Sequence, residues 1–198
     1  MGEKKKYRVQ SETTTTTYVY CWNAAHRSLE KARENKPGAL YFKMMAGVFA
    51  AFTVEGYLNH LGQERVGVWK NLERKLGPQE KLLLLRDMLH LSVDISSRPF
   101  QTLHDMVRLR DALAHGKTLT MKIDCVIDNP AEEESRYPQP TWKKLCSIES
   151  VERMVEDAEQ IIRYLCAELK LTRDPFVSSG SGSSKIQEIK IEKEIVVA

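Results

Sequence analysis

Glycine and proline divide this chain into segments of helical length, and this punctuation limits the folds open to it. The breaks fall at Pro37-Gly38, Gly62, Gly77-Pro78 and Gly116. The segments between them carry apolar residues at helical spacing. Helices are therefore predicted over residues 18–34, 40–61, 64–76, 78–93, 99–115 and 147–169. This pattern predicts a mainly α-helical (all-α class) bundle of about five to six helices.

The stretch between the last two predicted helices has a different character. Residues 118–127 alternate in polarity and are rich in β-forming types, and residues 141–146 could pair back with them. A polar loop with prolines, residues 128–140, separates the two segments. The sequence therefore predicts a small β-hairpin inserted before the last helix.

The two ends of the chain differ in composition from its body. Residues 1–17 are basic and then contain a run of threonines, and we expect them to be a disordered tail. Residues 18–176 are expected to form one helical domain. Residues 177–198 begin with a Gly/Ser-rich linker and continue into a tail that fits a strand or a loose helix. We leave this tail unassigned, with disorder preferred over an intermolecular arm.

Composition excludes several classes of function. The net charge of +3 over 198 residues gives no strong field for a polyanion. No apolar run reaches the roughly 18 residues that a membrane span needs. The four cysteines form no Cys-x-x-Cys pair, which argues against a zinc knuckle and favours reduced thiols in a cytoplasmic protein. We expect neither a metal ion nor another cofactor.

The predicted helix 99–115 places charge inside its apolar face. On a helical wheel Arg110 falls near the middle of the arc formed by Leu103, Met106, Val107, Leu109, Leu113 and Ala114. A neighbouring polar stripe holds His104, Arg108, Asp111 and His115. Asp111 precedes His115 by four residues, so its carboxylate can orient or charge the imidazole.

The predicted helix 40–61 shows the same anomaly. Its apolar face is defined by Tyr41, Met44, Met45, Val48, Phe49 and Phe52. Glu55 and Asn59 fall on that face. Because burying a lone charge costs several kcal/mol, we expect Glu55 to pair with Arg110 across the bundle, with Asn59 adding a hydrogen bond. The alternative interpretation is that this pair only sets the register of the two helices.

An arginine and a histidine without metal ligands suit phosphodiester cleavage by an internal 2′-hydroxyl. Histidine moves a proton near neutral pH, and the arginine fork stabilises the charge that develops on phosphorus oxygens. One residue of each type is sparse for this chemistry. Two copies of the helix across a dimer axis would supply two of each.

The segment Arg110-Asp111-x-x-x-His115 resembles the Arg-x4-His signature of the HEPN superfamily (higher eukaryotes and prokaryotes nucleotide-binding domains). The ending Ala114-His115-Gly116 is also common in that superfamily, and the helix that carries Glu55 and Asn59 resembles a family helix near the motif. The resemblance implies a homodimer whose paired motifs form a metal-independent RNA-cleaving cleft. It also implies a role in antiviral defence or a toxin–antitoxin system, with RNA as substrate and an antitoxin or regulatory protein as a possible partner.

Carried onto this chain, the resemblance assigns Arg110 and His115 as the catalytic pair. Asp111 takes the orienting position, where asparagine is more familiar in the family. Supporting roles are expected for Glu55, Asn59, His104 and Arg108. The alternative, from another class of function, is a non-catalytic helical dimer that binds a partner protein or a nucleotide.

Overall fold

The computed structural model describes residues 6–126, 128–129 and 137–189, and within them the chain is mainly helical. The helices are α1 (Thr17–Arg33), α2 (Ala39–Arg65), α3 (Trp69–Leu72), α4 (Pro78–Leu89), α5 (Thr102–Ala114), α7 (Thr141–Lys144) and α8 (Ile148–Glu168). The strands are β1 (Lys6–Thr15) and β2 (Gly180–Ile189). The predicted mainly helical fold with one small pair of strands is confirmed. None of the described helices combines the length and the apolar character needed to cross a membrane.

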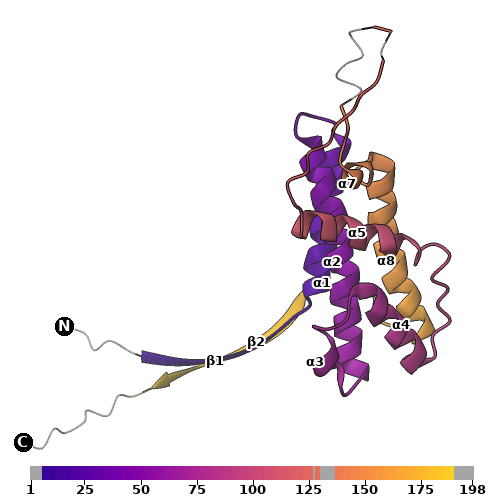
Figure 1. Ribbon diagram of the computed structural model, residues 1–198. Helices are drawn as coiled ribbons and strands as arrows, with labels where there is room; N and C mark the ends of the chain where they lie inside the picture. The colour runs from indigo at the N-terminus through magenta and orange to yellow at the C-terminus, as the bar shows by residue number, and fades with distance from the viewer. Residues whose placement is uncertain (1–5, 127, 130–136, 190–198) are drawn as a thin grey trace, which may run out of the picture.

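Helix α2 is the centre of the bundle, with α1, α4, α5 and α8 packed around it (Figure 1). Its inner surface is rich in small residues, and they allow close approach. A side chain at Gly47 would put its Cβ 2.5 Å from Leu109 Cδ2 of α5, and one at Gly56 would put it 3.1 Å from Tyr18 Cβ of α1. Glycine at both positions therefore lets the helices sit nearer than larger residues would permit.

The third predicted helix is largely absent, because α2 continues through Gly62 to Arg65. Gly62 was expected to end this helix, but the helix continues through it, and its missing side chain leaves space for the ring of Trp69. A Cβ there would lie 2.1 Å from the ring of Trp69, which is 1% exposed. Of the predicted helix 64–76, only the single turn α3 remains separate from α2.

The outer surface of α2 is unexpectedly apolar. Tyr41, Met45 and Phe52 are 68%, 45% and 40% exposed, although the helix as a whole is central. The residues that share this surface recur at alternating spacings of four and three, the pattern of a coiled-coil seam. We call them the outer row of α2: Tyr41, Met45, Val48, Phe52, Glu55 and Asn59.

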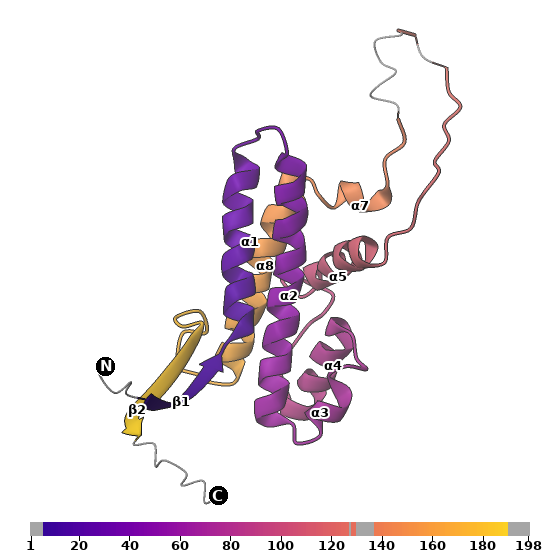
Figure 2. The ribbon, with the colours of Figure 1, turned by 90° about the vertical axis from the view of Figure 1, so that its left-hand side faces the viewer.

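The two ends of the chain form the sheet, which corrects the expectation of a disordered N-terminal tail. β1 and β2 pair antiparallel, with Lys6 opposite Ile189 and Thr15 opposite Gly180. The threonine run supplies β-branched residues that favour this extended conformation. The resulting ribbon projects away from the bundle (Figures 1 and 2). Residues 1–5 and 190–198 of the predicted tails lie outside the described residues.

The hairpin predicted before the last helix is not found in the described part of its sequence. Residues 117–126 have no regular secondary structure and pair with no described strand, and residues 141–144 form the short helix α7 instead of a second strand. Alternation alone does not make a strand, because the backbone groups need a partner to bind. Ser147 caps the start of α8, since its side chain accepts a hydrogen bond from the Ser150 N–H at 3.1 Å.

Two buried phenols make the fold sensitive to alkali. Burial raises the pKa of Tyr18 from 10.0 to about 12, and burial also raises the pKa of Tyr57, whose hydroxyl lies 3.1 Å from Cys166 Sγ. The neutral phenols therefore stabilise the fold fully below pH 10. As the pH rises from 10 towards 12, these two phenols ionise in the unfolded chain before they ionise in the folded one. Each phenol then lowers the free energy of unfolding by up to about 1.4 kcal/mol per pH unit.

Urea unfolding between pH 8 and pH 12 checks this expectation. Tyr57→Phe should make the alkaline loss of stability less steep, whereas Tyr20→Phe should not change it, because Tyr20 is 57% exposed. A wild-type slope retained in Tyr57→Phe would contradict the role given to this phenol.

Candidate functional site

The predicted pair between Glu55 and Arg110 is present and has a third member. Arg110 Nη1 donates to Glu55 Oε2 at 2.5 Å, and Lys81 Nζ donates to Glu55 Oε1 at 2.8 Å. The Lys81 side chain is 2% exposed, against 19% for Arg110 and 23% for Glu55. Glu55 therefore binds one cation through each carboxylate oxygen and joins α2 to both α4 and α5.

Asp111 binds Arg110 as well. Its Oδ1 accepts from Arg110 Nε at 2.9 Å and lies 2.8 Å from Arg110 Nη2. The guanidinium is thus bound by one carboxylate on each side. Among the described residues no hydrogen bond or ion pair joins the Asp111 carboxylate to the His115 imidazole, so the predicted orienting contact does not form in this structure.

His115 is the C-cap of α5, and its side chain is exposed. Its backbone N–H donates to the Asp111 carbonyl at 2.9 Å, which holds the residue at the helix end. His115 is therefore free to meet a substrate or a second chain, at the end of the helix that also holds Arg110.

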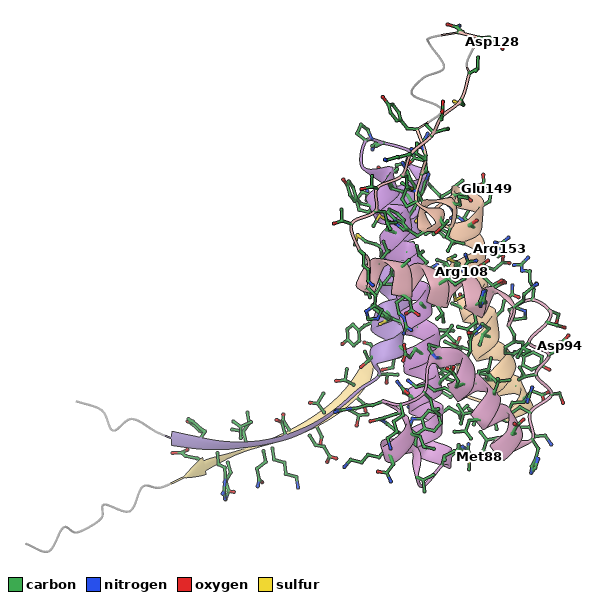
Figure 3. All side chains as sticks on the ribbon, in the orientation of Figure 1. Met88, Asp94, Arg108, Asp128, Glu149 and Arg153 are labelled. Carbon is green, nitrogen blue, oxygen red and sulfur yellow. The ribbon has the colours of Figure 1, made fainter. Side chains whose placement is uncertain are left out.

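The other predicted supporting residues lie apart from this cluster. Asn59 is on the outer row of α2, but its Oδ1 is buried without a hydrogen-bond partner, so the predicted bond is wrong. His104 lies near the start of α5, where its Nδ1 is 3.3 Å from Gln79 Nε2. Arg108 is exposed on α5, where Figure 3 labels it together with Arg153 of α8, and both pair loosely with Asp105 at 3.7 Å.

Lys81 was missed by sequence reasoning, although a signal was present. It shares a helix face with Pro78, Leu82 and Leu85, all of which are buried. That spacing places a lysine on an apolar face, the same anomaly that drew attention to Glu55 and Arg110. Lys81 extends the pair of Glu55 and Arg110 into a network of three charges that joins α2, α4 and α5.

A cavity of about 720 Å³ lies elsewhere. Its apolar lining includes Leu83, Ile95 and Phe100, and its polar rim includes His104 and Arg153. Neither Arg110 nor His115 lines it. The Arg110–His115 region is thus separate from this cavity, and His115 lies on the exposed surface.

This arrangement can transfer a proton and hold an anion. His115 supplies an exposed imidazole, and Arg110 supplies a forked cation whose counter-ion Asp111 is 48% exposed. No group of three or more potential metal ligands occurs among the described residues. Comparison with protein-family models, curated proteins and solved structures found no match to this chain.

Proposed function

We propose that this protein is a metal-independent endoribonuclease of the HEPN type that acts as a homodimer, in a defence or toxin–antitoxin setting. The observation that supports it best is the bond between Arg110 and Glu55. Glu55 belongs to the outer row of α2, so the motif and an exposed apolar surface adjoin each other. A second copy seated on that row would bring a second Arg110 and a second His115 close to the first pair.

The outer row has the properties of a dimer interface. Large apolar side chains at coiled-coil spacing are suited to packing against an identical helix around a two-fold axis. The row then changes to Glu55, which is 23% exposed, and to Asn59. We infer that apolar contact holds the two copies and that the polar end of the row borders the cleft.

The proposed reaction divides the proton transfers between the two copies. His115 of one copy removes the proton from a ribose 2′-hydroxyl, and the 2′-oxygen attacks the adjacent phosphorus. The bond from phosphorus to the 5′-oxygen breaks, and His115 of the other copy gives that oxygen a proton. The products are a 2′,3′-cyclic phosphate and a 5′-hydroxyl. Arg110 stabilises the charge on the phosphorus oxygens, with the phosphate replacing Asp111 on the guanidinium.

Cleavage of single-stranded RNA in the presence of EDTA tests the proposal. His115→Ala should lower the rate at least about a hundredfold, because it removes the acid and base, and Arg110→Lys should lower it because the fork is lost. His90→Asn is the matched control: it changes an exposed histidine at a positive φ that asparagine tolerates, and it should retain the wild-type rate.

A substrate with a 2′-deoxyribose at the cleaved position should remain intact. Equal cleavage by the wild type and His115→Ala would contradict the proposal. A wild type that dimerises but leaves RNA uncut would favour the non-catalytic module that binds a protein or a nucleotide.

A further inference from the structure

The ribbon of β1 and β2 has no support from the bundle beyond its base. There the Thr16 N–H donates to the Ser179 carbonyl at 2.7 Å. From Tyr7 to Thr15 and from Gly180 to Glu188 every residue is exposed, and no described helix packs against either strand. A two-stranded ribbon is at best marginally stable alone in water. The ribbon therefore calls for a surface that covers it.

The two faces of the ribbon differ in chemistry. Residues directly opposite each other in an antiparallel pair share a face. Val9 lies opposite Ile186, and both are on the face of Tyr7. These three side chains are 54–68% exposed. The other face carries Arg8 opposite Gln187 and Gln10 opposite Lys185. Glu188, opposite Tyr7, and the pair Ser11 and Ser184 share the face of Val9. The apolar side chains of the ribbon thus gather on one face, which we call its apolar face, and the other face is polar.

The direction of the ribbon indicates what covers it. In Figure 1 it leaves the bundle on the side where α5 ends, and Figure 2 looks onto that side, with α1 and α2 towards the viewer. In Figure 2 α1 and α5 lie on either side of α2 and α8 lies behind it, so the side of α2 that these helices leave open faces the viewer. The exposure of Tyr41, Met45 and Phe52 assigns the outer row to this open side. A second copy seated on the outer row would lie alongside the ribbon.

We propose that the apolar face of the ribbon packs against the bundle of a second copy of this chain, so that each copy clasps the other. The proposal rests on the homodimer of the proposed function and adds the ribbon as a second contact. A two-fold axis makes the contact reciprocal, and six apolar side chains, Tyr7, Val9 and Ile186 from each copy, leave water.

The charge of the ribbon favours this occupant over a nucleic acid. The two strands hold three basic and two acidic residues. This near balance gives little attraction for a polyanion, whose binding depends on many uncompensated lysines and arginines. A protein surface, by contrast, is suited to an apolar centre flanked by mixed charges.

Sedimentation equilibrium of two triple variants tests the clasp. Tyr7→Ser, Val9→Ser and Ile186→Ser change the apolar face, and Arg8→Ser, Gln10→Ser and Gln187→Ser change the polar face at the same number of positions. Replacing the apolar face should raise the dimer Kd at least about tenfold, whereas the polar-face control should raise it less than about threefold. Equal shifts, or no shift in either variant, would overturn the clasp.

Hydrogen exchange of the ribbon amides in the wild type is a second test of whether the ribbon is covered in the dimer, and it needs no variant. Protection of β1 should be high well above the dimer Kd and should fall on dilution below it. Protection that is independent of concentration would contradict the proposal. RNA binding weakened by the polar-face variant, with the dimer Kd unchanged in both variants, would make the ribbon a nucleic-acid contact instead.

The outcomes also separate this proposal from the nuclease. A wild type that fails to cleave RNA overturns the nuclease alone, because sedimentation reports only association. A wild type that stays monomeric overturns both the homodimer and the clasp.

Discussion

Replacing Glu55 with alanine should lower the free energy of unfolding by about 3–5 kcal/mol, because it leaves a buried lysine without its counter-charge. Lys81 Nζ has Glu55 as its ion-pair partner, and the Lys81 side chain is 2% exposed. Arg110 would keep Asp111, so Lys81 accounts for most of the loss. Urea unfolding monitored by circular dichroism at neutral pH measures the effect.

Two further variants make this expectation specific. Lys81→Met in the Glu55→Gln background should restore most of the stability, since a neutral pair removes the buried charge while preserving volume. Glu30→Ala is the exposed control, because Glu30 pairs with Arg27 at 3.0 Å while both side chains are largely in water. It should cost less than about 1 kcal/mol. A similar cost for Glu30→Ala and Glu55→Ala would show that the buried network is not needed for stability.

Asp157→Ala should lower the free energy of unfolding by about 2–4 kcal/mol through the loss of three charge-assisted hydrogen bonds. Asp157 is 0% exposed, and its carboxylate accepts from Arg98 Nε at 2.9 Å, from Arg98 Nη2 at 2.7 Å and from Thr102 Oγ1 at 2.5 Å. These bonds tie the start of α5 to the middle of α8. The carboxylate also raises the pKa of Arg98.

The neighbouring residue supplies the control for this prediction. Glu156 lies 3.3 Å from the same guanidinium, but its side chain is 62% exposed. Glu156→Ala should therefore change stability by less than about 0.5 kcal/mol. If the two alanine variants unfold at the same urea concentration, then burial of Asp157 does not determine its contribution.

The Glu55–Arg110 pair was predictable because each charge interrupts an otherwise apolar helix face, and such charges need partners. The position of that face in the fold was not predictable in the same way. α2 is apolar around most of its circumference, so periodicity does not tell which side faces the core. Packing decides it: Ala46, Gly47 and Ala50 allow close helix contact and are buried, and the larger Tyr41 is exposed.

The strands were predicted less well than the helices, because a strand was expected where none is found and disorder was expected where two strands pair. Alternating residues around Leu119 and Met121 predicted a strand, yet no described strand lies beside them. The threonine run and the Gly/Ser-rich segment predicted disorder, yet they pair with each other. Strand formation depends on a partner that local composition does not reveal. The same holds for the contact between His115 and Asp111, because Arg110 competes for the carboxylate.

The pairing of β1 with β2 also has a consequence for how the chain folds. It joins the most distant residues of the described chain, Lys6 and Ile189. Contacts of such long sequence separation form late, because loop closure costs entropy before the contact stabilises anything. During synthesis β1 therefore leaves the ribosome long before its partner strand exists. Until β2 has been made, this β-prone segment has an unpaired backbone and is open to pairing with another molecule.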